Sequence, residues 1–92
     1  MAILDKDSIN AFLEKYTEWN HIDNSIQKEF VLKDFSSAVA LTVRMGIEAE
    51  KLGHHPDILL HSWNKVKVTL STHSEGGLTN KDLELADIFE EL

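Results

Sequence analysis

The chain has 92 residues, no cysteine, and 9 basic against 16 acidic side chains, which gives a formal net charge of −7. The length predicts a single domain over residues 1–92, and the missing cysteine excludes disulfides, thiolate nucleophiles and cysteine-type zinc sites. The acidic charge disfavours direct nucleic-acid binding, which depends on neutralising phosphates. The sequence contains neither a signal-peptide pattern nor an apolar stretch long enough for a membrane span, so we expect a cytoplasmic protein without membrane association.

The first third of the chain predicts a short helix and two strands. Residues 5–16 carry one apolar stripe at helical spacing, and Asp5 or Asp7 is the expected N-cap. Residues 19–22 form a short strand candidate that ends in an Asp-Asn-Ser turn. Residues 26–33 alternate between two faces, as expected of a half-buried strand.

A long helix is predicted from its N-cap Asp34 to about Leu52, where Gly53 stops it. Two apolar stripes run along this helix. One consists of Phe35, Val39, Val43, Gly46 and Ile47, and the other consists of Ala38, Leu41, Met45, Ala49 and Leu52. One stripe can cover a sheet, whereas the other needs a neighbouring helix or a second subunit.

The last third predicts a hairpin and a final helix. Strands at 58–63 and 66–72 flank a turn at Asn64-Lys65, and the last helix covers 78–92. Its N-terminus carries Thr79 as the N-cap and Asp82 in a capping-box position. The element order α-β-β-α-β-β-α predicts an α+β sandwich of two layers, in which amphipathic helices cover one face of a mainly antiparallel sheet.

Three of the five histidines occupy positions that indicate a site. His54 and His55 follow the end of the long helix, where Pro56 favours an extended and rigid corner. His73 ends a strand on the face opposite its valines, so we expect it on the uncovered face of the sheet. Imidazoles, with an ordinary pKa of about 6.5, are natural general acids and bases, and two or three of them could move protons on a small molecule.

Two other interpretations of these histidines stay open at this point. They can be ordinary turn and strand-end residues. Three histidines and a water can also bind catalytic zinc. Adjacent histidines seldom chelate one ion together and the chain has no His-x₃-His pair, so we expect no metal.

Several other side chains have both a functional and a structural interpretation. Glu50, one turn before His54, could orient an imidazole or bind a donor-rich ligand, or it is a solvated acid. Trp19 and Trp63 could wall a flat aromatic ligand, although tryptophan more often fills a core or an interface. The capping box by itself explains Asp82.

An ordered set of residues resembles the motif of the pterin-4a-carbinolamine dehydratase family, and every spacing of that motif is met. The set consists of Glu50, His54-His55-Pro56, Trp63, His73 and Asp82. The similarity covers about residues 19–92. It implies a four-stranded antiparallel sheet with three helices on one face, in a homodimer or a homotetramer.

The resemblance also implies an activity. The protein would be a hydro-lyase that dehydrates 4a-hydroxytetrahydropterin to quinonoid dihydropterin, with no metal and no organic cofactor. It would recycle the pterin of aromatic amino acid hydroxylases, which makes a hydroxylase a candidate partner. The alternative is a protein-interaction module, because animal members of the family also act as dimerisation cofactors of a homeodomain transcription factor.

Individual roles follow from the same resemblance. His54 and His73 are implied as the acid–base pair on either side of the pterin, and His55 is implied in binding and transition-state support. Gly53 stands where animal members carry an acid, which weakens the expected acid role of His54. The implied substrate-binding residues are Glu50, Pro56, Trp19 and Asp82.

Overall fold

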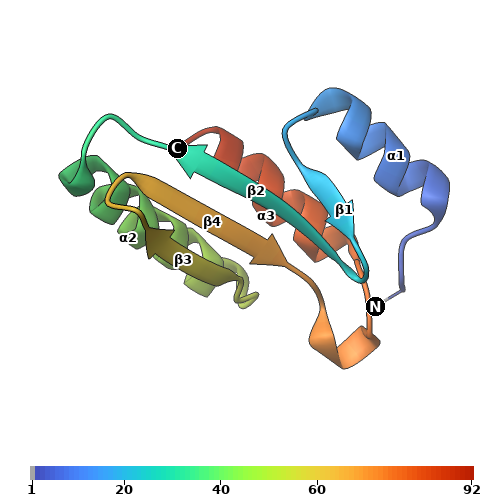
Figure 1. Cartoon of the computed structure of the whole chain (residues 1–92). Helices are drawn as coiled ribbons and strands as arrows, with labels where there is room; N and C mark the ends of the chain where they lie inside the picture. The colour runs from blue at the N-terminus through green and yellow to red at the C-terminus, as the bar shows by residue number, and fades with distance from the viewer. Residues whose placement is uncertain (1) are drawn as a thin grey trace.

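The structure is a computed structural model that describes residues 2–92, and its elements follow the predicted order. The helices are α1 (Lys6–Lys15), α2 (Phe35–Leu52) and α3 (Asn80–Glu90), and a short 3₁₀ turn, η1 (His73–Glu75), precedes α3. The strands are β1 (Asn20–Ile22), β2 (Ser25–Val31), β3 (Asp57–His61) and β4 (Lys65–Leu70). All strand pairs are antiparallel, and the sheet order is β1-β2-β4-β3. The predicted α+β fold is therefore confirmed (Figure 1).

The helices cover one face of the sheet and leave the other face open. In Figure 1, α2 and α3 lie behind the central strands, and α1 lies beside β1. Trp19 connects α1 to the same core, because its ring makes edge-on contacts with Phe12 of α1 and Phe30 of β2. The strand side chains that are fully buried under the helices are Ile26, Val66, Val68 and Leu70. Their neighbours in the chain point to the open face, because side chains alternate along a strand.

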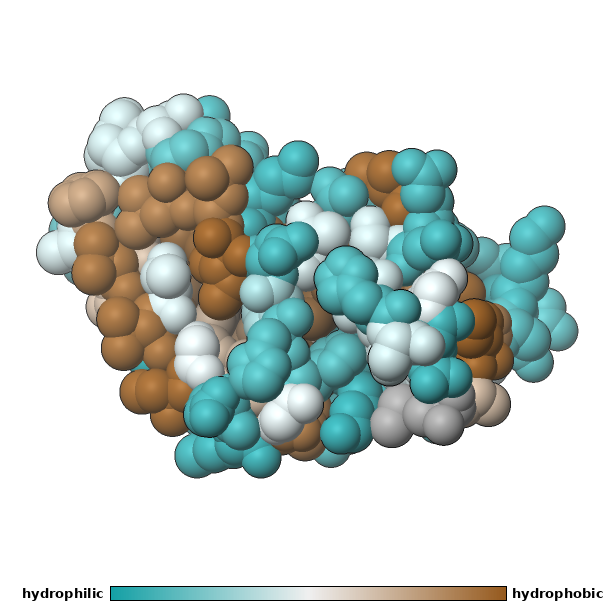
Figure 2. Space-filling view, turned by 90° about the horizontal axis from the view of Figure 1, so that it is seen from below, coloured by the Kyte–Doolittle hydropathy of each residue, from teal (hydrophilic) through white to brown (hydrophobic). Residues whose placement is uncertain are grey.

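The structure decides between the two apolar stripes of α2. Ala38, Leu41, Met45 and Ala49 are buried against the sheet and α3. The other stripe remains 39–55% exposed at Phe35, Val39, Val43 and Ile47. Figure 2 shows a hydrophobic area on the side of the molecule where α2 and β3 lie.

Both ends of α2 agree with the prediction. The Asp34 side chain accepts a hydrogen bond of 2.8 Å from the backbone N–H of Ser37. Gly53 adopts the left-handed conformation, with φ of 65°, that ends a helix and favours glycine. The direction in which the chain leaves α2, and with it the placement of His54 and His55, depends on this turn.

Most predicted boundaries differ from the structure by one to three residues, and two of the differences affect the site. The β3–β4 turn is a three-residue loop, Ser62–Asn64, because His61 pairs with Lys65. Asn64 is tied to the end of β2 by hydrogen bonds of its backbone and its side chain to Leu32. Strand β4 ends at Leu70, and His73 begins η1 instead of ending a strand.

The early end of β4 has a local cause. The backbone of Thr72 forms an isolated antiparallel bridge with Gly77, with an N–H to oxygen distance of 2.9 Å. The chain turns back on itself between these two residues, and η1 is the turn. None of the helices between residues 2 and 92 has the length and hydropathy needed to cross a bilayer.

Candidate active site

A polar pocket lies on the open face of the sheet, at the end where β2 and β3 begin and β4 ends. Its floor is a row of three side chains from adjacent strands. Thr69 of β4 is the register partner of both Gln27 of β2 and Asp57 of β3. Register partners project to the same face, so the three side chains lie next to one another. Ser25 of β2 and Ser71, which directly follows the end of β4, continue this lining, each two residues from this row.

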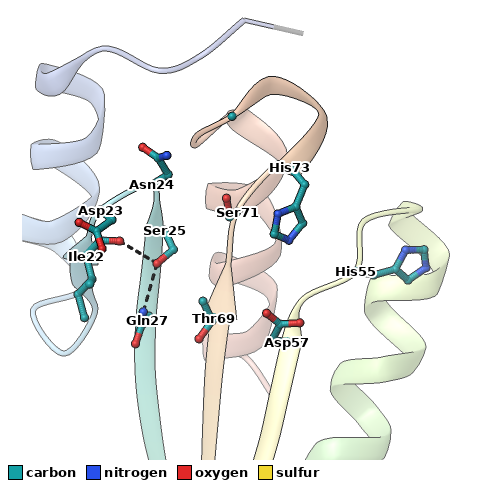
Figure 3. A pocket seen from close by; sticks show the side chains of 11 residues that line it. Ile22, Asp23, Asn24, Ser25, Gln27, His55, Asp57, Thr69, Ser71 and His73 are labelled. Atoms are coloured by element: carbon teal, nitrogen blue, oxygen red, sulfur yellow. Dashed lines mark hydrogen bonds between the residues drawn. The ribbon is translucent and has the colours of Figure 1, made fainter.

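Two histidines from separate segments stand at this pocket. His55 comes from the corner after α2, and His73 comes from η1. Figure 3 shows both imidazoles on the same side of the pocket, with Asp57 below them and the turn of Ile22, Asp23 and Asn24 opposite. The pocket has a volume of about 280 Å³ and opens to solvent.

His55 is paired with an acid. Its Nε2 lies 2.8 Å from Oε1 of Glu50, in the last turn of α2. Both side chains are largely in solvent, with exposed fractions of 68% for His55 and 81% for Glu50. The pair can orient the imidazole while leaving it accessible to a ligand. Two of the interpretations given for Glu50, an acid that orients an imidazole and a solvated acid, both fit this geometry.

His54 is in a different environment. Its side chain is only 11% exposed, and its Nε2 lies 2.5 Å from Oδ1 of Asp82, which is completely buried. His54 therefore faces the interior behind the pocket, and it is not among the residues that line the pocket. Because an ionised carboxylate only accepts hydrogen bonds, the His54 imidazole carries a proton on Nε2.

Asp82 does more than cap α3. The predicted capping box is present, and Asp82 Oδ2 accepts a 2.9 Å hydrogen bond from the backbone N–H of Thr79. The same oxygen accepts from the hydroxyl of Thr72 at 2.7 Å, while Oδ1 pairs with His54. Three donors make it possible to bury this carboxylate, whose burial without partners would be costly.

The remaining predicted residues lie in three different places. Pro56 is half-buried beside His55 at the corner. Trp19 is 2% exposed, lies in the core, and donates from Nε1 to Glu90. It therefore does not wall the pocket. Trp63 is 62% exposed in the β3–β4 loop, at the opposite end of the sheet.

The other two histidines are not part of the pocket lining. His21 is exposed on β1. His61 lies on the open face and pairs with Glu29 at 2.5 Å. Among residues 2–92, no group of three or more His, Asp or Glu side chains is arranged as a metal site would require.

Sequence reasoning missed several pocket residues, and Asp57 is the most informative of them. It follows Pro56 directly and would have been found by extending the polar alternation of β4 to its partner strand. Gln27 was missed because its partner in the sheet, Thr69, is more than 40 positions away in the chain. The signal for it appears only once the strand register is known.

The comparisons with known proteins agree on one family. Residues 2–92 match the model of the family described as Pterin 4 alpha carbinolamine dehydratase. Proteins from Picosynechococcus sp. and from Roseiflexus castenholzii, both provisionally named as pterin-4-alpha-carbinolamine dehydratases, are each 44% identical to the chain. These alignments cover 97% and 99% of the chain, and 96% and 97% of the two relatives.

Solved structures agree in fold. A crystal structure described as a transcriptional coactivator/pterin dehydratase from Brucella melitensis superposes with a TM-score of 0.90 at 35% identity, covering 98% of this chain and 97% of that one. A pterin dehydratase-like protein, described as a RuBisCO assembly factor in the alpha-carboxysome, is 18% identical and has a TM-score of 0.65 over 79% of this chain and 83% of its own. The second similarity concerns the fold alone. The match over nearly the whole chain and the identity to its relatives show that this protein belongs to the pterin-4-alpha-carbinolamine dehydratase family.

Proposed function

We propose that the protein dehydrates 4a-hydroxytetrahydropterin to quinonoid dihydropterin by histidine acid–base catalysis. The observation that carries this proposal is the pocket itself, where two imidazoles from separate segments stand over a polar floor. Family membership supports a dehydratase, and the pocket supplies groups suited to proton transfer.

The reaction needs two proton movements and no redox partner. The C4a–O bond breaks, a proton joins the leaving hydroxyl to form water, N5 loses its proton, and a C4a–N5 double bond forms. One protonated imidazole can act as the acid and a neutral one as the base. The proton taken from N5 replaces the one given to water, so the protein returns to its starting state by exchange with solvent.

We assign these two roles to His55 and His73, which line the pocket. This differs from the pairing of His54 with His73 that the family resemblance implied. His54 faces Asp82 instead, and we assign it the positioning of the corner that carries His55. Glu50 then serves to orient His55.

The floor of the pocket fits the edge of a pterin ring. A pterin offers an amino group and a ring N–H as neighbouring donors, and a carbonyl as an acceptor. The Asp57 carboxylate can accept from such donors, while the Gln27 amide can both donate and accept. Both side chains lie in one row with Thr69, so a flat ligand can contact all three.

The test is a spectroscopic assay that follows the loss of the 4a-hydroxypterin absorbance. The wild type should accelerate this loss over the uncatalysed rate, and His73→Ala should reduce kcat by at least about 100-fold, the usual contribution of a general acid or base. His61→Ala is the matched control, since His61 lies on the same sheet face outside the pocket. A wild type that does not exceed the uncatalysed rate would exclude the proposal.

The exposed stripe of α2 favours a second role in association. Phe35, Val39, Val43 and Ile47 form a contiguous apolar face that is not covered within the described chain. We propose that this face mediates self-association or binding of a protein partner. Light scattering with chromatography should give a homodimer or homotetramer for the wild type and a smaller species for Val43→Glu. Arg44→Glu, a charge change beside the stripe, should leave the mass unchanged.

A further inference from the structure

The buried network behind the pocket joins the two segments that carry the pocket histidines. Asp82 is fully buried, and its two carboxylate oxygens have different partners. Oδ1 pairs with His54, and Oδ2 accepts from the hydroxyl of Thr72. His54 directly precedes His55, and Thr72 directly precedes His73. One carboxylate therefore holds the residue next to each pocket imidazole.

The direction of the hydroxyl hydrogen bonds follows from this arrangement. The ionised carboxylate of Asp82 only accepts, so Thr72 donates its single hydroxyl proton to Oδ2 at 2.7 Å. Thr79 Oγ1 lies 2.8 Å from Thr72 Oγ1 and must then donate to it. Thr72 thus stands in the middle of a buried chain that runs from Thr79 through Thr72 to Asp82.

The backbone of Thr72 also anchors η1. Its N–H donates to Gly77 at 2.9 Å, and its carbonyl accepts from the N–H of Glu75 at 3.0 Å. The turn that carries His73 has only three residues. A shift of Thr72 therefore moves His73 as well, because the two residues are adjacent and the turn is too short to compensate for the movement.

We infer that Thr72 is a positioning residue for the dehydration: its hydroxyl, through Asp82, sets the placement of His73 relative to His55. The inference rests on the proposed function. Thr72 is 9% exposed and does not line the pocket, so it acts through the histidines and not on the ligand. Catalytic groups misplaced by about 1 Å can lose about 100-fold in rate.

The experiment compares Thr72→Val with Thr72→Ser in the full chain. Valine keeps the branched shape and removes the hydroxyl, whereas serine keeps the hydroxyl. We expect kcat to fall about 10- to 100-fold in Thr72→Val, with a much smaller change in KM, and to return largely in Thr72→Ser. Thr42→Val is the matched control, because it removes a hydroxyl that donates to the carbonyl of Ala38 within α2.

A second measurement does not depend on activity. Two-dimensional NMR of the imidazole rings should show the His54 and His73 signals moving in Thr72→Val and staying in place in Thr42→Val. If Thr72→Val fails to fold by circular dichroism, Thr72→Ala replaces it, since it removes the same hydroxyl with a smaller side chain and leaves the capping box of Thr79 and Asp82 in place. We expect the same changes from Thr72→Ala.

Three outcomes would overturn the inference. They are an unchanged kcat in Thr72→Val, a loss in Thr72→Ser as large as in Thr72→Val, and His73 ring signals that do not respond to loss of the hydroxyl. A wild type without dehydratase activity would instead refute the proposed function. The ring signals would then still decide whether Thr72 controls the placement of His73.

Discussion

His54 and His55 are neighbours in the chain, yet they lie in opposite environments. The His54 side chain is 11% exposed and pairs with the buried Asp82, whereas the His55 side chain is 68% exposed and pairs with the solvated Glu50. Both pairs join an imidazole to a carboxylate at hydrogen-bond distance. Burial, and not the identity of the partners, separates their roles.

This difference distinguishes the side chains that stabilise the fold from those that can act on a ligand. A buried hydrogen-bonded pair is destabilising to break, because the partner that remains is buried without a hydrogen bond. An exposed pair contributes little to stability but leaves its imidazole free to meet a ligand. The buried network of His54 and Asp82 therefore stabilises the structure behind the pocket. The exposed pair of His55 and Glu50 places an imidazole at the pocket itself.

The largest expected effect comes from removing the carboxylate of the buried pair. Asp82→Ala should lower the free energy of unfolding by about 3 kcal/mol or more, since His54, Thr72 and the Thr79 N–H each lose their buried acceptor at a cost of about 1–3 kcal/mol. Glu50→Ala should change it by less than about 1 kcal/mol. Urea unfolding followed by circular dichroism measures both. Equal losses of unfolding free energy in the two variants would contradict the expected difference between the buried and the exposed pair.

The two histidines should separate stability from activity. His54→Ala should cost about 1–3 kcal/mol, because it leaves Asp82 Oδ1 buried without a donor. His55→Ala should leave the urea midpoint nearly unchanged but reduce kcat by about 100-fold or more. Each variant is measured in both assays. A His55→Ala variant with full activity would mean that His55 is not the acid or base.

The smallest effect concerns the helix caps, where the same contrast of burial recurs. Asp82, in the capping box of α3, is fully buried, whereas Asp34, the N-cap of α2, is half-buried at the surface. Hydrogen bonds from the Ser37 side chain and backbone N–H hold the pKa of Asp34 below its usual value. Its contribution to stability is therefore present above the unfolded-state pKa, about 3.9, and is lost as the pH falls through the lower folded-state pKa.

Asp34→Asn tests the direction of this pH dependence of stability. Asparagine caps a helix about as well as aspartate but does not titrate. The wild type should therefore lose unfolding free energy relative to Asp34→Asn as the pH is lowered from 7 to below about 4. Urea titrations at a series of pH values measure the unfolding free energy of both proteins. A wild type that gains stability relative to Asp34→Asn on acidification would contradict the assignment.

Local patterns predicted most of the fold because its elements begin and end at locally readable signals. Helix α2 begins at the N-cap Asp34 and ends at the left-handed turn of Gly53, and both signals depend on neighbours in the chain. The β3–β4 turn was misplaced because Asn64 bonds to Leu32, more than 30 residues away. The predicted end of β4 is wrong for a local reason: the bridge between Thr72 and Gly77 turns the chain back, and the alternation of the residues before it does not reveal this turn.

The candidate site was likewise predicted in part from local patterns, while the rest depends on contacts between distant segments. The spacing of Glu50, His54, His55 and His73 indicated the family, and the family model confirmed it. Spacing did not reveal that Asp57 and Gln27 share the pocket floor, because that depends on the register of three strands. It also did not reveal that Trp19 lies in the core.

The sequence by itself determined the order of elements, the caps, the two faces of each helix and strand, and the family. These depend on periodicity and on contacts within a few residues. Only the tertiary structure decided which stripe of α2 is buried, and which of the two adjacent histidines faces the pocket. The physical reason is that periodicity defines faces but not neighbours: whether a face meets the core, a buried carboxylate or solvent is decided by segments far away in the chain.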